Sequence, residues 1–344
     1  MQHIKSFLEV KQIYIYIIFL ICGAVLGLSF GDLKNLFEPF ISLFLAILLF
    51  SMFAQIPFLN LKDKLLDFKY VLALLVSNFI LIPIFVFILV SLFNVTSIPI
   101  LIGVYLVLLT PCIDYVIVFT KLGKGDAQYM LISTPILFIV QFVLLPVYFV
   151  LFLRQDFSQY IKLGPFIETF VLLILIPFIL VLILQLASQK SIQMKKCLNL
   201  TEWLPVPFMA LVLMVVIASH ISTLTHDLDN VITVIPIYIC FMVIAPFIGS
   251  FTGKLFALPV DLKRTLAFSS STRNALVVLP LALSLPKEWS AIVTVVIVTQ
   301  TVVELIGELV YIRVIKNSSN KLFFNILITL FCYLMKSCNN RVIL

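Results

Sequence analysis

Long apolar stretches alternate with short polar breaks along most of the 344-residue chain. The apolar stretches cover roughly 12–30, 36–58, 68–93, 96–120, 127–152, 164–187, 203–222, 231–256, 264–285 and 289–312. Most of them reach about 20 residues, the length that an α-helix needs to cross a hydrocarbon core of about 30 Å. The pattern therefore predicts an all-α polytopic membrane protein with ten transmembrane helices.

Composition excludes a soluble domain. The chain is 62% hydrophobic and 11% charged, with a mean hydropathy of +1.21, so its helices would have no polar face to show to water. No small-residue cleavage site follows the first apolar stretch, which we interpret as a retained helix rather than a signal peptide. The six cysteines show neither a CxxC pair nor a metal-like spacing, so we expect no disulfide and no metal site.

The distribution of basic residues predicts the orientation. If the N-terminus is cytoplasmic, fifteen Lys and Arg residues lie on the cytoplasmic side and four on the other side, which is a strong positive-inside bias. The cytoplasmic fifteen are Lys5, Lys11, Lys62, Lys64, Lys69, Lys121, Lys124, Lys190, Lys195, Lys196, Lys254, Lys263, Arg264, Arg313 and Lys316. The net charge of +7 follows from these loops, and we expect no nucleic-acid partner.

Ten helices divide into two groups of five, 1–157 and 158–316, and leave the tail 317–344 unassigned. An odd number of helices in each group means that, if the two groups are repeats, they face opposite ways across the membrane. Inverted repeats of this kind are common in secondary transporters, which bind their substrates near the midplane between interrupted helices.

One polar cluster interrupts the fourth predicted helix, in TPCIDYVIV. Pro111 removes a backbone hydrogen bond and predicts a helix break, and Cys112 and Asp114 follow it. A carboxylate at this depth costs roughly 2.5–3.5 kcal/mol on insertion scales unless it has a partner. A structural kink, a structural salt bridge and a structural cysteine remain alternatives to a role in transport.

A second cluster interrupts the ninth predicted helix, in SSSTRN. The candidate binding residues here are Ser270, Ser271, Thr272, Arg273 and Asn274. The position matches that of the first cluster in the other half, so the two broken helices are predicted to cross at the midplane, with Asp114 facing Arg273. The alternative is a purely structural role, in which the Ser and Thr hydroxyls donate hydrogen bonds only to carbonyls of their own helix.

Two carboxylates lie four residues apart on the tenth predicted helix and therefore on one face. Glu304 is the deeper of the two and, with Asp114, is a candidate for proton coupling. We interpret Glu308 as extending toward the cytoplasm with Arg313.

Enzyme chemistry is disfavoured. GKGD at 123–126 matches the GxGD signature of intramembrane aspartyl proteases, but those need two carboxylates about 3 Å apart. On one continuous helix, Asp114 and Asp126 would be about 18 Å apart. The chain also has no nucleotide-binding motif, so we expect neither an enzyme nor an ATP-driven pump.

With these features, the chain resembles the bile acid/sodium symporter superfamily, and within it the arsenite efflux permeases and the related bacterial arsenic resistance proteins. TPCIDYVIVFTKLGKGDA, AFSSSTRNALVVLPLAL and TQTVVELIGELVYIRV carry the resemblance, which spans about residues 12–316. It implies a panel domain (helices 1, 2, 6 and 7), a core domain (helices 3–5 and 8–10) and a cysteine, Cys112, that meets arsenite. It also implies a multi-pass protein of the bacterial plasma membrane.

This chain departs from the pattern of those relatives in its ninth helix. The arsenite permeases carry a glutamate where this chain has Ala275 or Leu276. Where the sodium-coupled branch supplies a glutamate and a glutamine to sodium, this chain has Ser269 and Arg273. A guanidinium in a cation site repels sodium or occupies its place.

The residues and the resemblance together predict a secondary transporter that exports arsenite or a similar small oxyanion in exchange for protons. The alternative is a cation-coupled symporter for an organic anion that binds Arg273. The expected partners are a small anionic or metalloid solute and the lipid bilayer. No cofactor is expected; the coupling ion is H⁺, with Na⁺ as the alternative.

Overall fold

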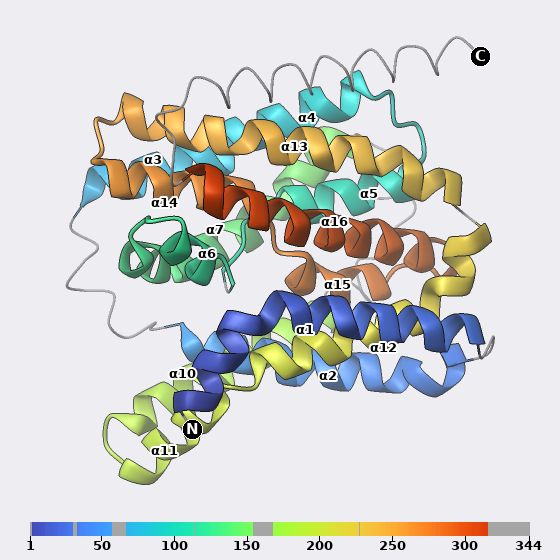
Figure 1. Ribbon diagram of the computed structural model, residues 1–344, viewed down its shortest axis with the longest axis horizontal. Coiled ribbons are helices and arrows are strands. Elements are labelled where there is room, and N and C mark those ends of the chain that lie inside the picture. The colour runs from blue at the N-terminus through green and yellow to red at the C-terminus, as the bar shows by residue number, and fades with distance from the viewer. Residues whose placement is uncertain are drawn as a thin grey trace. The chain divides into compact units, whose positions relative to one another are not determined.

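A computed structural model of the chain describes residues 2–29, 33–56, 67–113, 115–153, 168–226 and 228–315 (Figure 1). Nearly all of these residues are helical. The first helices are α1 (Gln2–Ser29), α2 (Leu33–Gln55), α3 (Phe68–Val76), η2 (Ser77–Leu81), α4 (Ile82–Leu92), α5 (Ile98–Leu108), α6 (Val116–Leu122) and α7 (Ala127–Leu153). The later ones are η4 (Val171–Leu175), α10 (Ile176–Ser188), α11 (Ile192–Thr201), α12 (Pro205–His226), α13 (Leu228–Leu255), α14 (Val260–Ser271), α15 (Ala275–Leu283) and α16 (Lys287–Val314).

Five of the described helical stretches are long and apolar enough to cross a membrane. They are Phe68–Leu92, Ala127–Phe152, Glu168–Ser188, Thr233–Leu255 and Glu288–Val314. The pair Ile192–Thr201 and Pro205–Ser219, bent by 42°, makes a sixth if it is counted as one span. An all-helical integral membrane protein is thereby confirmed, whereas the ten-helix inverted repeat stays a prediction.

Contacts between residues divide the chain into two compact units that are interleaved in sequence. Unit 1 contains Met1–Asp63, Gln155–Leu228 and Ala275–Val298, and unit 2 contains Lys64–Arg154, Asp229–Asn274 and Thr299–Leu344. Unit 1 thus holds α1, α2, α10 and α12, the helices that the resemblance assigns to the panel domain, together with α11, α15 and the first part of α16. The two predicted repeats, 1–157 and 158–316, are defined by internal symmetry and not by contacts. They therefore stay a prediction. The tail 317–344 lies outside the described residues.

In unit 1, α12 packs against both α1 and α2 (Figure 1). Gly23 permits a close approach of α1 to α12, because a Cβ atom there would lie 2.4 Å from the Met214 carbonyl oxygen. The opposite face of α1 exposes large apolar side chains, among them Tyr14 and Leu28. Exposed apolar side chains along a helix that also has a buried face are what a lipid-facing surface requires.

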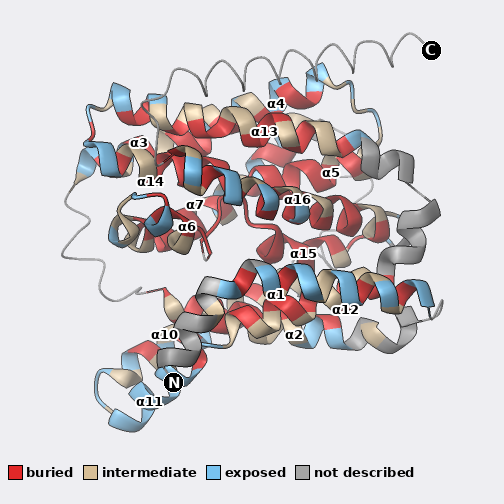
Figure 2. Cartoon of the chain, in the orientation of Figure 1, coloured by how far each residue is buried: buried red, intermediate tan, exposed pale blue. Residues whose placement is uncertain are grey.

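In unit 2, the short helices that precede the two interruptions, α5 and α14, are largely buried. Nearly all of α5 is buried, as is most of α14 from Leu262 to Ser271 (Figure 2). Helix α13 approaches α14 closely at Gly249, where a Cβ atom would lie 2.5 Å from the Leu266 carbonyl oxygen. Such burial in an apolar chain requires that the polar groups of α14 find partners inside the protein.

Two helices change to a π-helical turn directly before an Ile–Pro pair. In the first, η2 precedes Pro83; in the second, η4 precedes Pro177. A π-helical turn inserts one residue into the helix and is frequent at functional sites. The turn η2 matters below, because it begins with Ser77 and Asn78, the polar pair in the middle of this apolar span.

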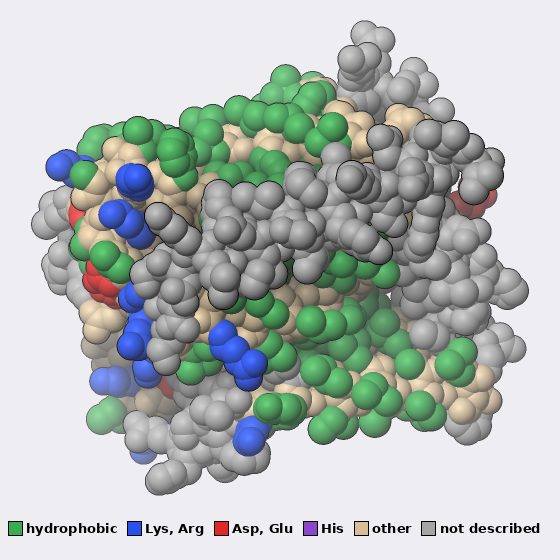
Figure 3. Space-filling view, turned by 45° about the horizontal axis from the view of Figure 1, so that its top comes forward, with side chains coloured by type: hydrophobic (Ala, Val, Ile, Leu, Met, Phe, Trp, Pro, Cys, Tyr) green, Lys and Arg blue, Asp and Glu red, His purple; other side chains and the backbone are tan. Residues whose placement is uncertain are grey.

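Hydrophobic side chains cover much of the face shown in Figure 3, and Lys and Arg side chains gather in a few places on it. This arrangement agrees with a protein whose apolar surface lies in lipid and whose charged residues lie outside the hydrocarbon core.

Candidate functional site

Helices α5 and α6 are separated by a non-helical segment that contains Pro111. Helix α5 ends at Leu108 and α6 begins at Val116. The Thr110 hydroxyl donates back to the Leu106 carbonyl at 2.9 Å, so it satisfies one of the carbonyls at the end of α5. The backbone beyond Thr110 is left to find partners elsewhere.

Helices α14 and α15 are separated in a similar way. Helix α14 ends at Ser271, α15 begins at Ala275, and Thr272 has an extended backbone with φ −92° and ψ 129°. The polar run SSSTRN therefore continues past the end of α14, and Thr272, Arg273 and Asn274 are presented by non-helical backbone.

The two non-helical segments pair with each other. The Cys112 amide donates to the Thr272 carbonyl at 3.1 Å, the Asn274 amide donates to the Thr110 carbonyl at 2.8 Å, and an antiparallel β-bridge joins Pro111 to Arg273. We call residues 110–112 and 272–274 the crossing. Each interruption thus supplies hydrogen-bond partners for the other in a buried, apolar setting.

This pairing explains why a proline is tolerated at position 111. The two bonds flank the Pro111–Arg273 pair, so these two residues occupy a non-hydrogen-bonded position of the antiparallel pattern. An N–H at position 111 would have no partner in this pattern, and proline lacks that N–H.

The Arg273 guanidinium is fully buried at the C-terminal ends of α5 and α14, the two half-helices that precede the interruptions. Its Nη2 donates to the Ser269 carbonyl at 3.0 Å and also to the Ser270 carbonyl, both in the last turn of α14. Its Nη1 lies 3.4 Å from the Leu108 carbonyl at the end of α5. A helix C-terminus carries partial negative charge. The guanidinium compensates this charge as a cation that is covalently part of the protein, and we call it the tethered cation.

Residues of η2 hold the guanidinium from another side. Asn78 accepts a hydrogen bond from Nη2 of Arg273 at 3.0 Å and donates through Nδ2 to the Ser269 hydroxyl at 3.0 Å. Ser77 and Ser270 share a hydrogen bond of 2.7 Å between their hydroxyls. The Phe241 ring lies 5.4 Å from the guanidinium carbon, within the range of a cation–π contact.

Glu304 lies on α16 and accepts hydrogen bonds at the crossing from three groups. These are the Tyr115 hydroxyl at 2.6 Å, the Arg273 backbone amide at 2.9 Å and the Gln300 side-chain amide. The carboxylate is completely buried. Three donors are what an ionised carboxylate needs when it has no water around it.

Glu308, one turn further along α16, has a different environment. Its Oε1 lies 2.7 Å from the Thr272 hydroxyl, which also lies 2.8 Å from the Phe268 carbonyl. Oε2 of Glu308 is buried without a hydrogen-bond partner in the described part of the chain. A hydroxyl has one proton, so Thr272 can donate to only one of its two neighbours at a time. The two glutamates, although on one helix face, therefore differ in how well their oxygens are satisfied.

The structure places most of the other residues that the sequence predicted for the site. Cys112 is buried at the crossing, and Asn274 takes part through its backbone amide. The Ser271 hydroxyl donates to the Ala267 carbonyl of its own helix at 2.7 Å, as expected for a structural role of this residue. Asp114 lies outside the described residues, so its pairing with Arg273 stays a prediction.

Sequence reasoning missed Asn78, Tyr115 and Gln300, and it placed Glu308 toward the cytoplasm, whereas Glu308 is completely buried. A signal existed for Asn78, because Ser77 and Asn78 interrupt an otherwise apolar span. Tyr115 gave no such signal. A tyrosine in an apolar helix is common, and its hydroxyl acquires meaning only through its contact with Glu304.

The chain was compared with known protein families and with curated proteins. A sequence model described as the sodium bile acid symporter family matches residues 42–227, which is more than half of the chain. A search of curated proteins found no match.

Proposed function

Because the chain belongs to the sodium bile acid symporter family, a family of transporters and not of enzymes, we propose that it is a secondary transporter coupled to protons rather than to sodium. The solute that we propose is arsenite or a similar small oxyanion, which the protein exports. The observation that carries the proton coupling is the position of the Arg273 guanidinium.

In secondary transporters, the C-terminal ends of half-helices and their unwound carbonyls coordinate the coupling cation. Here the carbonyls of Ser269, Ser270 and Leu108 surround a guanidinium that belongs to the protein itself. A second cation at this place would meet a full positive charge at short range in a medium of low dielectric. Sodium coupling through these carbonyls is therefore disfavoured while Arg273 stays in place.

Buried carboxylates next to this cation supply the proposed proton carriers. Glu304 has three donors, which suits its ionised form, whereas a protonated Glu308 can donate to the Thr272 hydroxyl. Thr272 then donates its own proton to the Phe268 carbonyl. We propose that the coupled proton occupies this pair of carboxylates, with Asp114 as a further candidate.

The proposed solute rests on Cys112 and on the resemblance to the arsenite permeases. Thiol sulfur prefers soft partners, and Cys112 lies at the crossing of the two broken helices. The proposed topology is ten transmembrane helices in two inverted repeats, with both ends of the ten-helix core on the cytoplasmic side of a bacterial plasma membrane. The positive-inside distribution of Lys and Arg supports this orientation.

A second candidate is a symporter for an organic anion. One feature of Arg273 favours it, because Nε of the guanidinium is buried without a hydrogen-bond partner in the described part of the chain. An oxygen of a carboxylate or sulfonate would satisfy this donor.

Resistance to arsenite in a sensitive bacterial host separates the two candidates. We expect the wild-type chain to confer resistance, and Cys112→Ser to abolish it while the protein remains in the membrane. Cys240→Ser is the matched control, because Cys240 is also completely buried but belongs to α13 and to neither interruption. Absence of resistance with the wild-type chain contradicts arsenite efflux, and full resistance with Cys112→Ser contradicts coordination by its thiol.

A further inference from the structure

Helix α11 exposes basic and large apolar side chains together. It connects α10 to α12, and its exposed side chains include Lys195 and Lys196 together with Ile192, which is 75% exposed, and Leu200. A short helix that exposes both lysines and large apolar residues is suited to a membrane interface, where its apolar groups enter the acyl region and its ammonium groups meet the headgroups.

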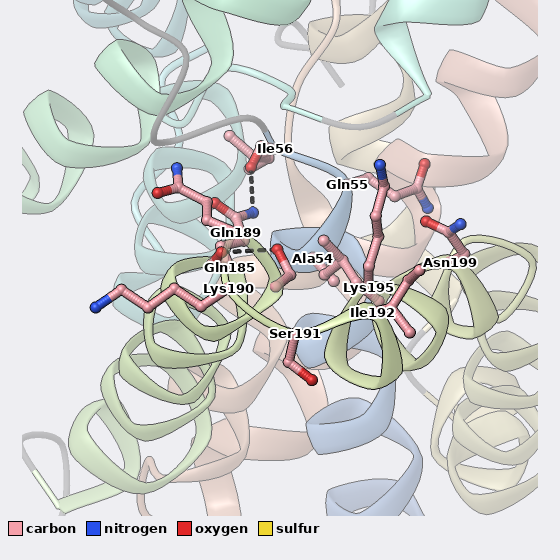
Figure 4. Close-up of a pocket in the computed structure, with 12 residues that line it drawn as sticks. Ala54, Gln55, Ile56, Gln185, Gln189, Lys190, Ser191, Ile192, Lys195 and Asn199 are labelled. Carbon is pink, nitrogen blue, oxygen red and sulfur yellow. Dashed lines mark hydrogen bonds between the residues drawn. The ribbon is translucent and has the colours of Figure 1, made fainter.

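A cavity of about 730 Å³ opens between this helix and the ends of α2 and α10. Figure 4 shows the side chains around it. The described residues that line it are Ala54, Gln55, Ile56, Gln185, Ser188, Gln189, Lys190, Ser191, Ile192, Lys195, Leu198 and Asn199. This set contains two lysines, several amides and no acidic residue, so the cavity favours an anion with oxygen acceptors.

One polar side chain of the cavity is held in place by a hydrogen bond between two helices. Gln185 is almost fully buried and donates through Nε2 to the Ile56 carbonyl at 2.7 Å, which ties α10 to the end of α2. In Figure 4, Lys195, Gln55 and Asn199 extend on the same side of the cavity, whereas Lys190 points away from them. Lys195 is therefore the cation best placed to bind a ligand there.

The first turn of α11 adds donors to the same cavity. Ser191 is the N-cap residue and has an extended backbone, but its side chain makes no capping hydrogen bond. Free amides at the start of a helix carry partial positive charge and bind phosphate oxygens readily. The Ser191 amide itself donates to the Ala187 carbonyl at 3.0 Å, so the amides at the start of this helix that are available to a ligand begin at Ile192, which lines the cavity together with Lys195.

We propose that this cavity binds the phosphate-bearing headgroup of an anionic phospholipid. Basic pockets beside transmembrane helices are suited to such headgroups. A lipid accounts for the apolar exposure as well as for the charge, because Ile192 lines the cavity and is also exposed to the surroundings. A soluble anion would account for the lysines and amides alone. The proposal is independent of the transported solute.

Thermal unfolding of the purified full-length protein in a neutral detergent tests this site. Phosphatidylglycerol at tenfold its dissociation constant is expected to raise the unfolding midpoint by about 3 °C, whereas phosphatidylcholine leaves it unchanged. Lys195→Ala is expected to lose most of the shift, and Lys196→Ala, the adjacent exposed lysine that does not line the cavity, to keep it. Lys195→Arg, which retains the charge, keeps the shift.

Three results overturn the proposal. The first is an equal shift with phosphatidylcholine, and the second is an unchanged shift in Lys195→Ala. The third is a shift of the same size with inorganic phosphate or glycerol phosphate at the same concentration, which assigns the cavity to a soluble anion. If Lys195→Ala does not fold, Lys195→Gln is measured in its place, with the same expectation.

Discussion

The two interrupted helices make unequal contributions to the crossing. In the α5–α6 interruption, the described contacts come from the backbone of residues 110–112 and from the uncharged side chains of Thr110 and Tyr115, with Pro111 at the position that needs no N–H. In the α14–α15 interruption, Arg273 binds carbonyls of both half-helices and Thr272 contacts Glu308. Among the described residues of the two interruptions, the charge at the crossing therefore comes from the α14–α15 interruption.

This inequality has a physical basis in the burial of both segments. A broken helix in an apolar interior leaves amides and carbonyls without partners, and the two breaks solve this by pairing with each other. The C-terminal carbonyls still carry partial negative charge after that pairing. One buried guanidinium can compensate both ends only if it lies at the crossing, and Arg273 lies there.

Removing the charge of Arg273 is expected to have the largest effect. Arg273→Gln leaves the carbonyls of Leu108 and α14 without their donor and lowers the free energy of unfolding by about 3 kcal/mol. Thermal unfolding in sodium chloride and in choline chloride measures this. Because the tethered cation is gone, sodium should stabilise Arg273→Gln but not the wild type. A sodium effect of equal size in both proteins contradicts the role assigned to Arg273.

Neutralising Glu304 is expected to have a smaller effect on stability and a large one on coupling. Glu304→Gln presents an amide to donors that now meet a carboxylate, which costs about 1–2 kcal/mol in the free energy of unfolding. Transport in proteoliposomes should then no longer respond to a pH gradient. Glu288→Gln, an exposed glutamate at the start of the same helix, is the control and should retain that response. Retention of the response in Glu304→Gln rules out Glu304 as a proton carrier.

Substituting Pro111 is expected to have the smallest effect. Pro111→Ala adds an N–H where the bridge has no acceptor and frees the backbone of the unfolded chain, so the free energy of unfolding should fall by less than about 1 kcal/mol. Transport rates of this variant should stay close to those of the wild type. A loss as large as that of Arg273→Gln would show that the two interruptions contribute equally.

The positions of the interruptions could be predicted from the sequence, but most of the contacts could not. Pro111 and the SSSTRN run break apolar stretches in corresponding places, which is a local signal. Leu108, which binds Arg273, and Thr272, which contacts Glu308, belong to segments distant in sequence from these partners, and no local pattern specifies the two contacts. Asn78 reaches Arg273 from the π-helical turn η2, which the apolar pattern does not reveal.

The connection between α10 and α12 shows the same limit at the surface. Residues 188–202 lack a long apolar run, so the sequence analysis left them between two spans, whereas the structure forms helix α11 there. Its apolar and basic residues are interleaved over a short length, and the cavity beside it requires the ends of α2 and α10. Only the tertiary arrangement brings these three segments together.

The most direct test of the central claim is the ion dependence of transport by the wild-type protein in proteoliposomes. With arsenite as solute, we expect transport to follow an imposed pH gradient and to be unchanged when sodium replaces choline on either side. The Arg273 guanidinium would then hold the place of the coupling cation, as its contacts with the half-helix carbonyls indicate. Transport that follows a sodium gradient and ignores the pH gradient contradicts this account.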